Sequence, residues 1–355
     1  MDDATYQRLK ADADGRAQQR DRGDETSVTT SPDPQFATLG STSTGGWNPP
    51  DGALAVGPTS VLSGASEAFA IYSRSGTLEL GPVSFQKLFN EPSSASVYDP
   101  RALFDSGNNG AGGYNGGHGR FVLLATDGTH LALAVSQDET PESPTTAWCT
   151  YLINGVSTSA NGSTDWVDYP SLGIDGDSLY LTSNQFSNVD NSFQYPRVMV
   201  VSKASVYPNA STGTCGTPAG VDFTVDPSGA PLLQNPDGGA AFTVQPANMP
   251  DAAPGSSSGD TMYLVNAIWS SGSNLVVRSI TTGPGGASPV LMQPNWVTNG
   301  WIAPYNLPAA APQPNTTKRI DTGDDRLLSA TFRYGSIFTA NTTGTVSSQL
   351  NGRWG

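Results

Sequence analysis

The stretch Asp168-Tyr169-Pro170-Ser171-Leu172-Gly173-Ile174 decides the fold, because an earlier stretch, Asp99-Pro100-Arg101-Ala102-Leu103-Phe104, follows the same plan. In both, an acidic residue leads into a short apolar strand. Two further apolar strands then follow: Arg120–Ala125 and His130–Ser136 after the earlier stretch, and Ser178–Ser183 and Arg197–Ser202 after the later one. Strands that recur in blocks of about 40–50 residues are typical of β-propeller blades. The repeat therefore predicts an all-β propeller.

Working outward from this repeat, we expect a propeller of about five four-stranded blades. The predicted units span residues 47–80, 99–153, 168–203 with an outer strand at 221–225, 241–292, and 326–341. The fifth unit is too short for a full blade. We therefore expect either that the N-terminal segment closes the ring by supplying a missing strand, or that the chain is truncated from a longer propeller, because open sheet edges are prone to aggregation.

The composition agrees with many short strands joined by tight turns, since the 355 residues include 40 Gly and 27 Pro and only 14% are charged. Residues 2–25 differ from the rest, because they hold twelve charged residues and few large apolar ones. Such a segment has no face to bury against a core. We therefore predict a flexible charged arm and linker over residues 1–46 and one β-propeller domain over residues 47–355.

The net charge of −14 excludes nucleic acid as a partner, because phosphate-backbone binding draws on lysine and arginine, of which there are 17 in the chain. No apolar stretch approaches the length of a membrane span. The acidic, lysine-poor composition is typical of a secreted bacterial protein, and it suits Ca²⁺, which takes oxygen ligands. The start of the chain lacks the basic and apolar regions of a signal peptide. We expect an extracellular protein whose signal peptide is missing from this sequence.

The two cysteines, Cys149 and Cys215, are separated by 66 positions and lack the spacing of a zinc site. One interpretation is a disulfide between adjacent blades, as suits an extracellular protein. The other is a pair of buried thiols. Both remain open at this point.

Several short motifs resemble a group of secreted bacterial β-propeller proteins that are distantly related in architecture to sialidases and five-bladed glycosidases. The motifs that carry this resemblance are Pro49-Pro50-Asp51 with Ala55-Val56-Gly57-Pro58, Phe69-Ala70-Ile71-Tyr72, Gly81-Pro82-Val83-Ser84, Ala134-Val135-Ser136, Asp168-Tyr169-Pro170, Leu179-Tyr180-Leu181-Thr182 and Asp321-Thr322-Gly323-Asp324-Asp325-Arg326-Leu327-Leu328. The resemblance covers most of residues 47–341. It implies a secreted propeller and little specific chemistry.

Acidic residues recur just before the predicted first strands, where a propeller would gather them at one mouth of its channel. They are Asp51, Asp99, Asp168, and Asp324 or Asp325, with Asp251 or Asp260 in unit four. We consider three roles. Asp51, Asp99, Asp168, Asp324 and Asp325 could bind Ca²⁺. Asp99 and Asp168 could be a glycosidase pair, separated by about 5–5.5 Å for retention or about 6.5–9.5 Å for inversion. Alternatively, each Asp caps its own turn.

Other side chains are candidates for ligand binding. Arg101 and Arg326 accompany the acidic motifs, and Trp296, Trp301 and Tyr305 lie in a stretch rich in Pro, Asn and Gly that is suited to loops. Aromatic rings could stack on sugars, although such rings more often pack in the core. The histidines, His118 and His130, are poor candidates for a catalytic base.

These observations favour an extracellular recognition or scaffold module that binds a glycan or a protein partner at the channel mouth. The first alternative is a glycoside hydrolase that uses Asp99 and Asp168. The second is a structural subunit of a cell-surface assembly, in which the N-terminal arm mediates self-assembly by adding a strand to a neighbouring subunit.

Overall fold

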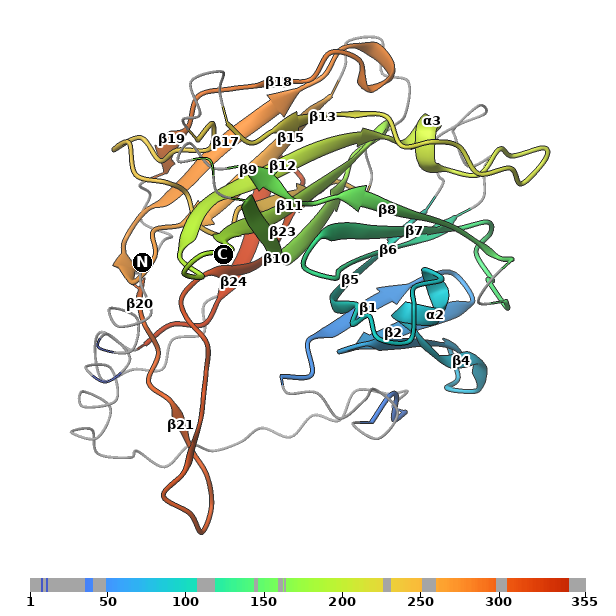
Figure 1. The fold of residues 1–355 in the computed structure, drawn as a ribbon, viewed down its shortest axis with the longest axis horizontal. Helices are drawn as coiled ribbons and strands as arrows, with labels where there is room; N and C mark the ends of the chain where they lie inside the picture. The colour runs from blue at the N-terminus through green and yellow to red at the C-terminus, as the bar shows by residue number, and fades with distance from the viewer. Residues whose placement is uncertain are drawn as a thin grey trace.

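The computed structural model describes residues 8, 11, 36–40, 49–106, 119–143, 146–158, 162, 164–225, 231–250, 260–297 and 305–344. Most of the predicted arm therefore lies outside the described residues. The fold is all-β, as predicted, and consists mainly of antiparallel sheets (Figure 1). Two short helices, α2 (Phe85–Leu88) and α3 (Lys203–Val206), follow strands of the first and third sheets.

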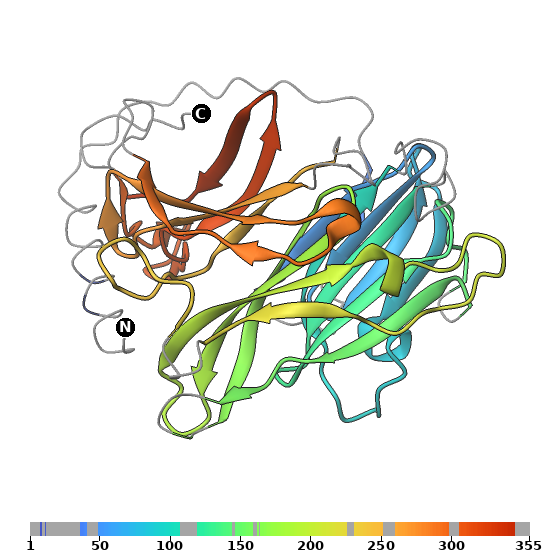
Figure 2. The same ribbon diagram turned by 90° about the horizontal axis from the view of Figure 1, so that it is seen from above.

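The first three sheets match the predicted units closely, because each is an antiparallel meander in chain order. The first contains β1 (Gly52–Val56), β2 (Ser60–Ala65), β3 (Ala68–Ser73) and β4 (Leu78–Ser84). The second contains β5 (Tyr98–Asp105), β6 (Arg120–Thr126), β7 (His130–Ser136) and β8 (Trp148–Asn154). The third contains β9 (Ser157–Thr158), β10 (Thr164–Ile174), β11 (Ser178–Ser187), β12 (Phe193–Ser202) and β13 (Gly220–Phe223). Figure 2 shows these sheets following one another from blue to yellow.

The last strands differ from the prediction of two separate blades, because β14 and β23 pair in parallel and merge units four and five into one sheet. This sheet contains β14 (Gln245–Asn248), β15 (Thr261–Ala267), β17 (Leu275–Thr281), β18 (Val290–Leu291), β19 (Asn295–Val297), β23 (Leu327–Arg333) and β24 (Ser336–Asn341). Small ladders join β16 (Ser271–Gly272) to β20 (Tyr305–Asn306) and β21 (Ala311–Pro312) to β22 (Arg319–Ile320). Among the described strands, no ladder links β24 to the first sheet, so the structure does not show a closed ring.

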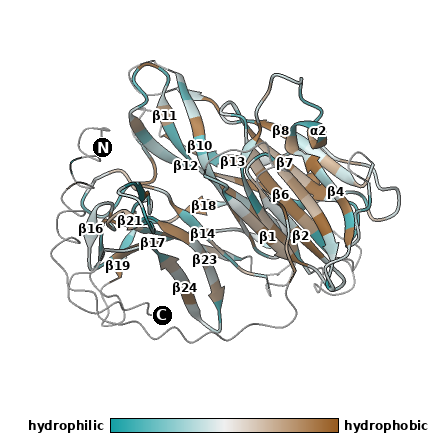
Figure 3. Ribbon diagram, turned by 90° about the horizontal axis from the view of Figure 1, so that it is seen from below, coloured by the Kyte–Doolittle hydropathy of each residue, from teal (hydrophilic) through white to brown (hydrophobic). Residues whose placement is uncertain are grey.

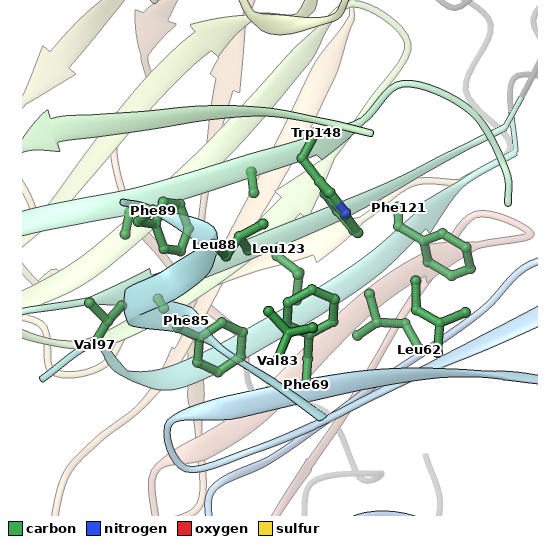
Figure 4. Packing of buried hydrophobic residues seen from close by; sticks show 14 of the residues in the cluster. Leu62, Phe69, Val83, Phe85, Leu88, Phe89, Val97, Phe121, Leu123 and Trp148 are labelled. Atoms are coloured by element: carbon green, nitrogen blue, oxygen red, sulfur yellow. The ribbon is translucent and has the colours of Figure 1, made fainter. Parts of the chain in front are cut away.

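The hydrophobic core lies between successive sheets, as expected when strands bury both faces. The cluster between the first and second sheets contains Phe69, Phe85, Phe121 and Trp148, whose side chains Figure 4 shows between the strands of these sheets. The Phe69 ring centroid lies 5.7 Å from that of Phe85 and 5.6 Å from that of Trp148. Figure 3 shows the corresponding hydrophobic residues along the strands of these two sheets. This packing fixes the relative position of β1 and β5, whose starts carry predicted site residues.

Two covalent or ionic links join the second and third sheets. Cys149 on β8 and Cys215 form a disulfide, which confirms the bridge between adjacent units. Deeper in the fold, the buried Lys203 Nζ lies 2.7 Å from Oδ2 of the buried Asp105, which also accepts a hydrogen bond from the Tyr207 hydroxyl. Because Asp105 is on β5 and Lys203 follows β12, this ion pair holds the two sheets together from the inside.

The predicted linker contacts the first sheet at its described residues. The Phe36 ring centroid lies 5.6 Å from that of Tyr72 on β3. A side chain at Gly76, in the turn between β3 and β4, would collide with Phe36, which shows how closely the segment approaches that turn. Residues 36–40 have no regular secondary structure. This position agrees with a segment laid along the first unit.

Candidate functional site

A backbone feature recurs at the strands β1, β5, β10 and β14: a non-glycine residue just before the strand or within it takes up a left-handed conformation. The φ angles are 32° at Asp51, 56° at Asp99, 51° at Tyr169 and 49° at Thr243. Such conformations are uncommon for residues with a side chain, and they gather at functional sites, where the surrounding structure maintains them. The recurrence therefore marks these four strands as the place to look for a site.

Two of these residues lie in bulges of their strands. The pairing of β5 with β6 shifts register between Tyr98 and Arg101, and that of β10 with β11 shifts between Asp168 and Ser171. Each bulge contains a proline, Pro100 or Pro170, which has no N–H to donate to a neighbouring strand. Because a bulge re-aims the side chains around it, the sequence Asp-Pro or Tyr-Pro turns Asp99 and Tyr169 out of the regular alternation.

Three of the predicted aspartates come together: Asp99 hydrogen-bonds through its side chain to both Asp51 and Asp168. Asp51 directly precedes β1, Asp99 lies in β5 and Asp168 in β10, so one carboxyl group comes from each of the first three sheets. Two carboxylates repel each other at hydrogen-bonding distance unless a proton lies between them. The middle group, Asp99, is therefore the one best placed to hold a proton, which it can donate to one neighbour at a time.

The electrostatics agree with this arrangement. Burial, and then the charges of Asp168 and Asp51, raise the pKa of Asp99 to about 7, against the lowering effect of Arg101. Burial also raises the pKa of Asp51, while Arg101 and the hydrogen bond from Asp99 lower it. A carboxyl group that exchanges its proton near neutral pH, beside other carboxyl groups, is the combination used in acid and base catalysis.

Both predicted arginines contact the ring of Tyr169, the residue that follows Asp168 in the chain. The Cζ atom of Arg101 lies 4.9 Å from the Tyr169 ring centroid and that of Arg326 lies 4.4 Å from it. These distances are typical of cation–π contacts. Arg326 is oriented by Asp324, whose Oδ1 accepts a 2.7 Å hydrogen bond from Nε while Oδ2 accepts one from Nη2. Tyr169 thereby links the second and third sheets to the last one.

The predicted ring of five carboxylates is not present, because the other aspartates have separate roles. Asp324 pairs with Arg326, and its Oδ1 also accepts from the Arg326 backbone N–H, as in an Asx turn. Asp325 is fully buried and accepts from the Ser270 N–H, and burial is the main cause that raises its pKa to about 6. Asp260 lies near Asp175 rather than in the group, and Asp251 lies outside the described residues.

Next to Arg326 is an aromatic pocket of about 290 Å³. Its lining residues are Phe193, Asn235, Ala240, Phe242, Ala267, Ile268 and Trp269. The Phe242 and Trp269 rings stack with centroids 4.3 Å apart, and the Arg326 Cζ lies 4.8 Å from the Phe242 centroid. Arg326 therefore contacts both Tyr169, beside the carboxyl groups, and Phe242, in the wall of the pocket.

The predicted aromatic ligand-binding residues are elsewhere. Tyr305 is buried, its hydroxyl donates to the Asn274 carbonyl and accepts from the Ile268 N–H, and it is therefore a structural residue. Trp296 is 39% exposed on the outer strand β19. Trp301 lies outside the described residues, as does His118. His130 is paired with Asp127, whose Oδ2 lies 2.8 Å from its Nδ1.

Phe193 and Phe242 have no signal in the sequence that places them at the site, and Trp269 is one of seven tryptophans that could stack on sugars. A motif signal existed only for Tyr169, which belongs to Asp168-Tyr169-Pro170. The three pocket rings come from β12, from the segment before β14 and from the segment after β15, and no spacing along the chain connects them. Only the packing of the third sheet against the fourth reveals their proximity.

Ca²⁺ at the aspartates stays a prediction. Within the described part of the chain, no group of three or more His, Cys, Asp or Glu side chains is arranged to hold a metal ion. Asp51, Asp99 and Asp168 offer oxygen ligands, but they hydrogen-bond to one another, so a cation would have to displace the proton held by Asp99.

No protein-family model matches the chain, and a comparison with curated proteins gives no significant match. The resemblance to secreted propellers therefore stays an expectation based on short motifs. None of the helices that the structure describes has the length and apolar character needed to cross a membrane.

Proposed function

We propose that the chain is a secreted β-propeller module of about five blades that binds a neutral glycan at the mouth formed by its first strands. The arrangement of those strands supports the propeller: β1 contacts β5, β5 contacts β10, β10 contacts β14, and β14 pairs with β23. Successive first strands thus lie side by side in chain order, as around a channel. Asp51 and Thr243 precede β1 and β14, Asp99 is the second residue of β5, and Tyr169 lies in the middle of β10.

The proposed ligand class rests on one observation. The three carboxyl groups of Asp51, Asp99 and Asp168 are connected to the aromatic pocket by the contacts among Tyr169, Arg326 and Phe242. A sugar presents hydroxyl groups, which hydrogen-bond to carboxylates, and C–H faces, which pack on aromatic rings. Polar groups beside an apolar wall are the usual composition of a small-molecule site. A neutral sugar is favoured over an anionic one, because the chain carries a net charge of −14.

Replacing Trp269 by alanine should weaken glycan binding by about 10-fold or more, because truncating a buried aromatic contact in a binding site typically costs at least ~1–2 kcal/mol. Isothermal titration calorimetry with xylohexaose, cellohexaose and arabinohexaose measures this. The matched control is Trp296→Ala, which removes a tryptophan on β19 and should leave the affinity unchanged. No binding of any of the three sugars to the wild type, or an equal loss in both variants, would count against the proposed site.

A glycoside hydrolase is the second candidate, and the raised pKa of Asp99 favours it. A protonated carboxyl group at neutral pH is a suitable general acid, and the neighbouring carboxylates are suited to act as base or nucleophile. The predicted pair of Asp99 and Asp168 needs modification, however. Their direct hydrogen bond places them closer than the about 5 Å needed to flank a glycosidic bond. Asp99 is better assigned as the acid alone, with Asp51 or Asp168 moving apart to admit the sugar.

Aryl glycosides of xylose, arabinose and glucose test this second candidate. A hydrolase should release the aryl group, and Asp99→Asn should lower the rate by about 100-fold or more, since general acid catalysis contributes at least that factor. The control is Glu142→Gln, an exposed carboxyl group outside the site. Binding of the oligosaccharides without release of any aryl group would identify a recognition module and rule out hydrolysis of these substrates.

A further inference from the structure

Thr243 is the most demanding of the left-handed residues, because a β-branched side chain disfavours this conformation strongly. It precedes β14, and its φ of 49° ends the predicted first strand of the fourth unit. β14 begins at Gln245, two residues after Thr243. Strain of this kind persists only where neighbouring groups maintain it.

Asn184, on β11 of the third sheet, is the group that maintains it. Its Oδ1 accepts a 3.0 Å hydrogen bond from the Thr243 N–H, and its Nδ2 donates a 2.9 Å hydrogen bond to the Thr243 Oγ1. Two positions along the strand, the Thr182 hydroxyl donates to the Val244 carbonyl over 2.8 Å. Asn184 is 1% exposed, so these bonds form without competition from water.

Asn184 also lies next to the cluster of Asp51, Asp99 and Asp168, because it is paired in register with Asp168 on β10. On the other side of Asn184, Thr243 directly follows Phe242 in the chain, and the Phe242 ring stacks on Trp269 and contacts Arg326. A single buried amide therefore lies between the Asp168 end of the site and the aromatic pocket.

We infer that Asn184 is a positioning residue of the glycan site, which holds Thr243 left-handed and thereby sets the Phe242 ring against Trp269 and Arg326. This inference rests on the proposed function for its consequence in binding. Its structural core, the action of Asn184 through Thr243, can be measured without a ligand.

The ligand-free measurement is the Trp269 contribution to near-UV circular dichroism, taken as the difference between each protein and the same protein with Trp269→Phe. Asn184→Ala should lose most of this contribution, because the stacked pair is no longer held. Asn184→Ala/Thr243→Gly should regain it, since glycine adopts positive φ without a clamp. The matched control is Asn188→Ala, which removes an exposed asparagine that bonds to Thr164 and should change nothing.

In titrations with the same three hexasaccharides, Asn184→Ala should bind about 10-fold more weakly than the wild type, and the double variant should recover most of that affinity. If Asn184→Ala fails to fold, Thr243→Gly is compared with Asn184→Ala/Thr243→Gly instead. These two variants should differ by less than about 2-fold in the Trp269 signal and in affinity. An undiminished Trp269 signal in Asn184→Ala, or a large loss in the Thr243→Gly background, would overturn the inference. A wild type that binds none of the sugars would refute the proposed function, while the dichroism would still decide the role of Asn184.

Discussion

Replacing Lys203 by methionine should lower the free energy of unfolding by about 3–5 kcal/mol at pH 8, the usual effect of removing one partner of a buried ion pair. The reason is that the buried Asp105 would lose the Lys203 ammonium group, which is its partner in the ion pair. Urea denaturation at pH 8 measures this effect.

Two controls accompany this prediction. Lys318→Met removes an exposed lysine and should change stability by less than about 0.5 kcal/mol. Lys203→Met/Asp105→Leu removes both charges of the ion pair and should be more stable than Lys203→Met, because it no longer buries the Asp105 carboxylate without its ammonium partner. If the double variant is instead the less stable of the two, the ion pair does not hold the second and third sheets together in the way described.

Replacing Asp99 by asparagine should stabilise the protein by about 2–3 kcal/mol at pH 8 and leave its stability unchanged near pH 4. The pKa of Asp99 rises from 3.8 in the unfolded chain to about 7 in the folded protein. Between these values the folded state holds more protons than the unfolded state, so stability falls as pH rises. A shift of about 3 units corresponds to about 4 kcal/mol, reduced here because Asp99 is partly exposed to solvent.

Thermal and urea unfolding of the wild type and Asp99→Asn from pH 4 to pH 8 tests the sign as well as the size. Asp260 and Asp325, whose pKa values are raised to about 6 mainly by burial, contribute a fall of the same sign to both proteins. Glu142→Gln, at an exposed position, should follow the wild type at every pH. A wild type that gains stability over Asp99→Asn between pH 5 and pH 8 would show that the three carboxyl groups do not share a proton.

The expected stability of Asp99→Asn also bears on function. A buried carboxyl group that destabilises the folded protein at neutral pH is the kind of local conflict that a functional site can contain. The left-handed backbone at Asp51, Asp99 and Tyr169 indicates the same conflict between local preference and structure. Such conflicts are expected at functional sites.

Much of this architecture could be predicted from the sequence. The repeated acidic residue and apolar strands predicted the order of strands in the first three sheets, because each strand pairs with the next one along the chain. In the third sheet, β10, β11 and β12 are longer than predicted and β9 was not predicted. The same repeat predicted the proximity of Asp51, Asp99 and Asp168. For Cys149 and Cys215 the sequence left a disulfide and a pair of thiols open, and the structure shows the disulfide.

The remaining features depend on contacts that have no local signal. The parallel pairing of Ala247 with Ala330 joins strands that are 83 residues apart. The left-handed conformation of Thr243 has no local signal either, because it is maintained by Asn184 on another sheet rather than by its own neighbours in sequence. Tyr305 was taken for a ligand-binding residue, and only its burial and its two hydrogen bonds show that it belongs to the core.

The most direct test of the central claim is a glycan array probed with the labelled wild type, Asp168→Asn and Trp269→Ala. These variants alter the two ends of the site, the carboxyl group and the aromatic pocket, which Arg326 and Tyr169 join. We expect the wild type to bind neutral oligosaccharides on the array, and both variants to lose binding to those same oligosaccharides. Retention of anionic glycans or of none, or variants that bind as well as the wild type, would contradict it.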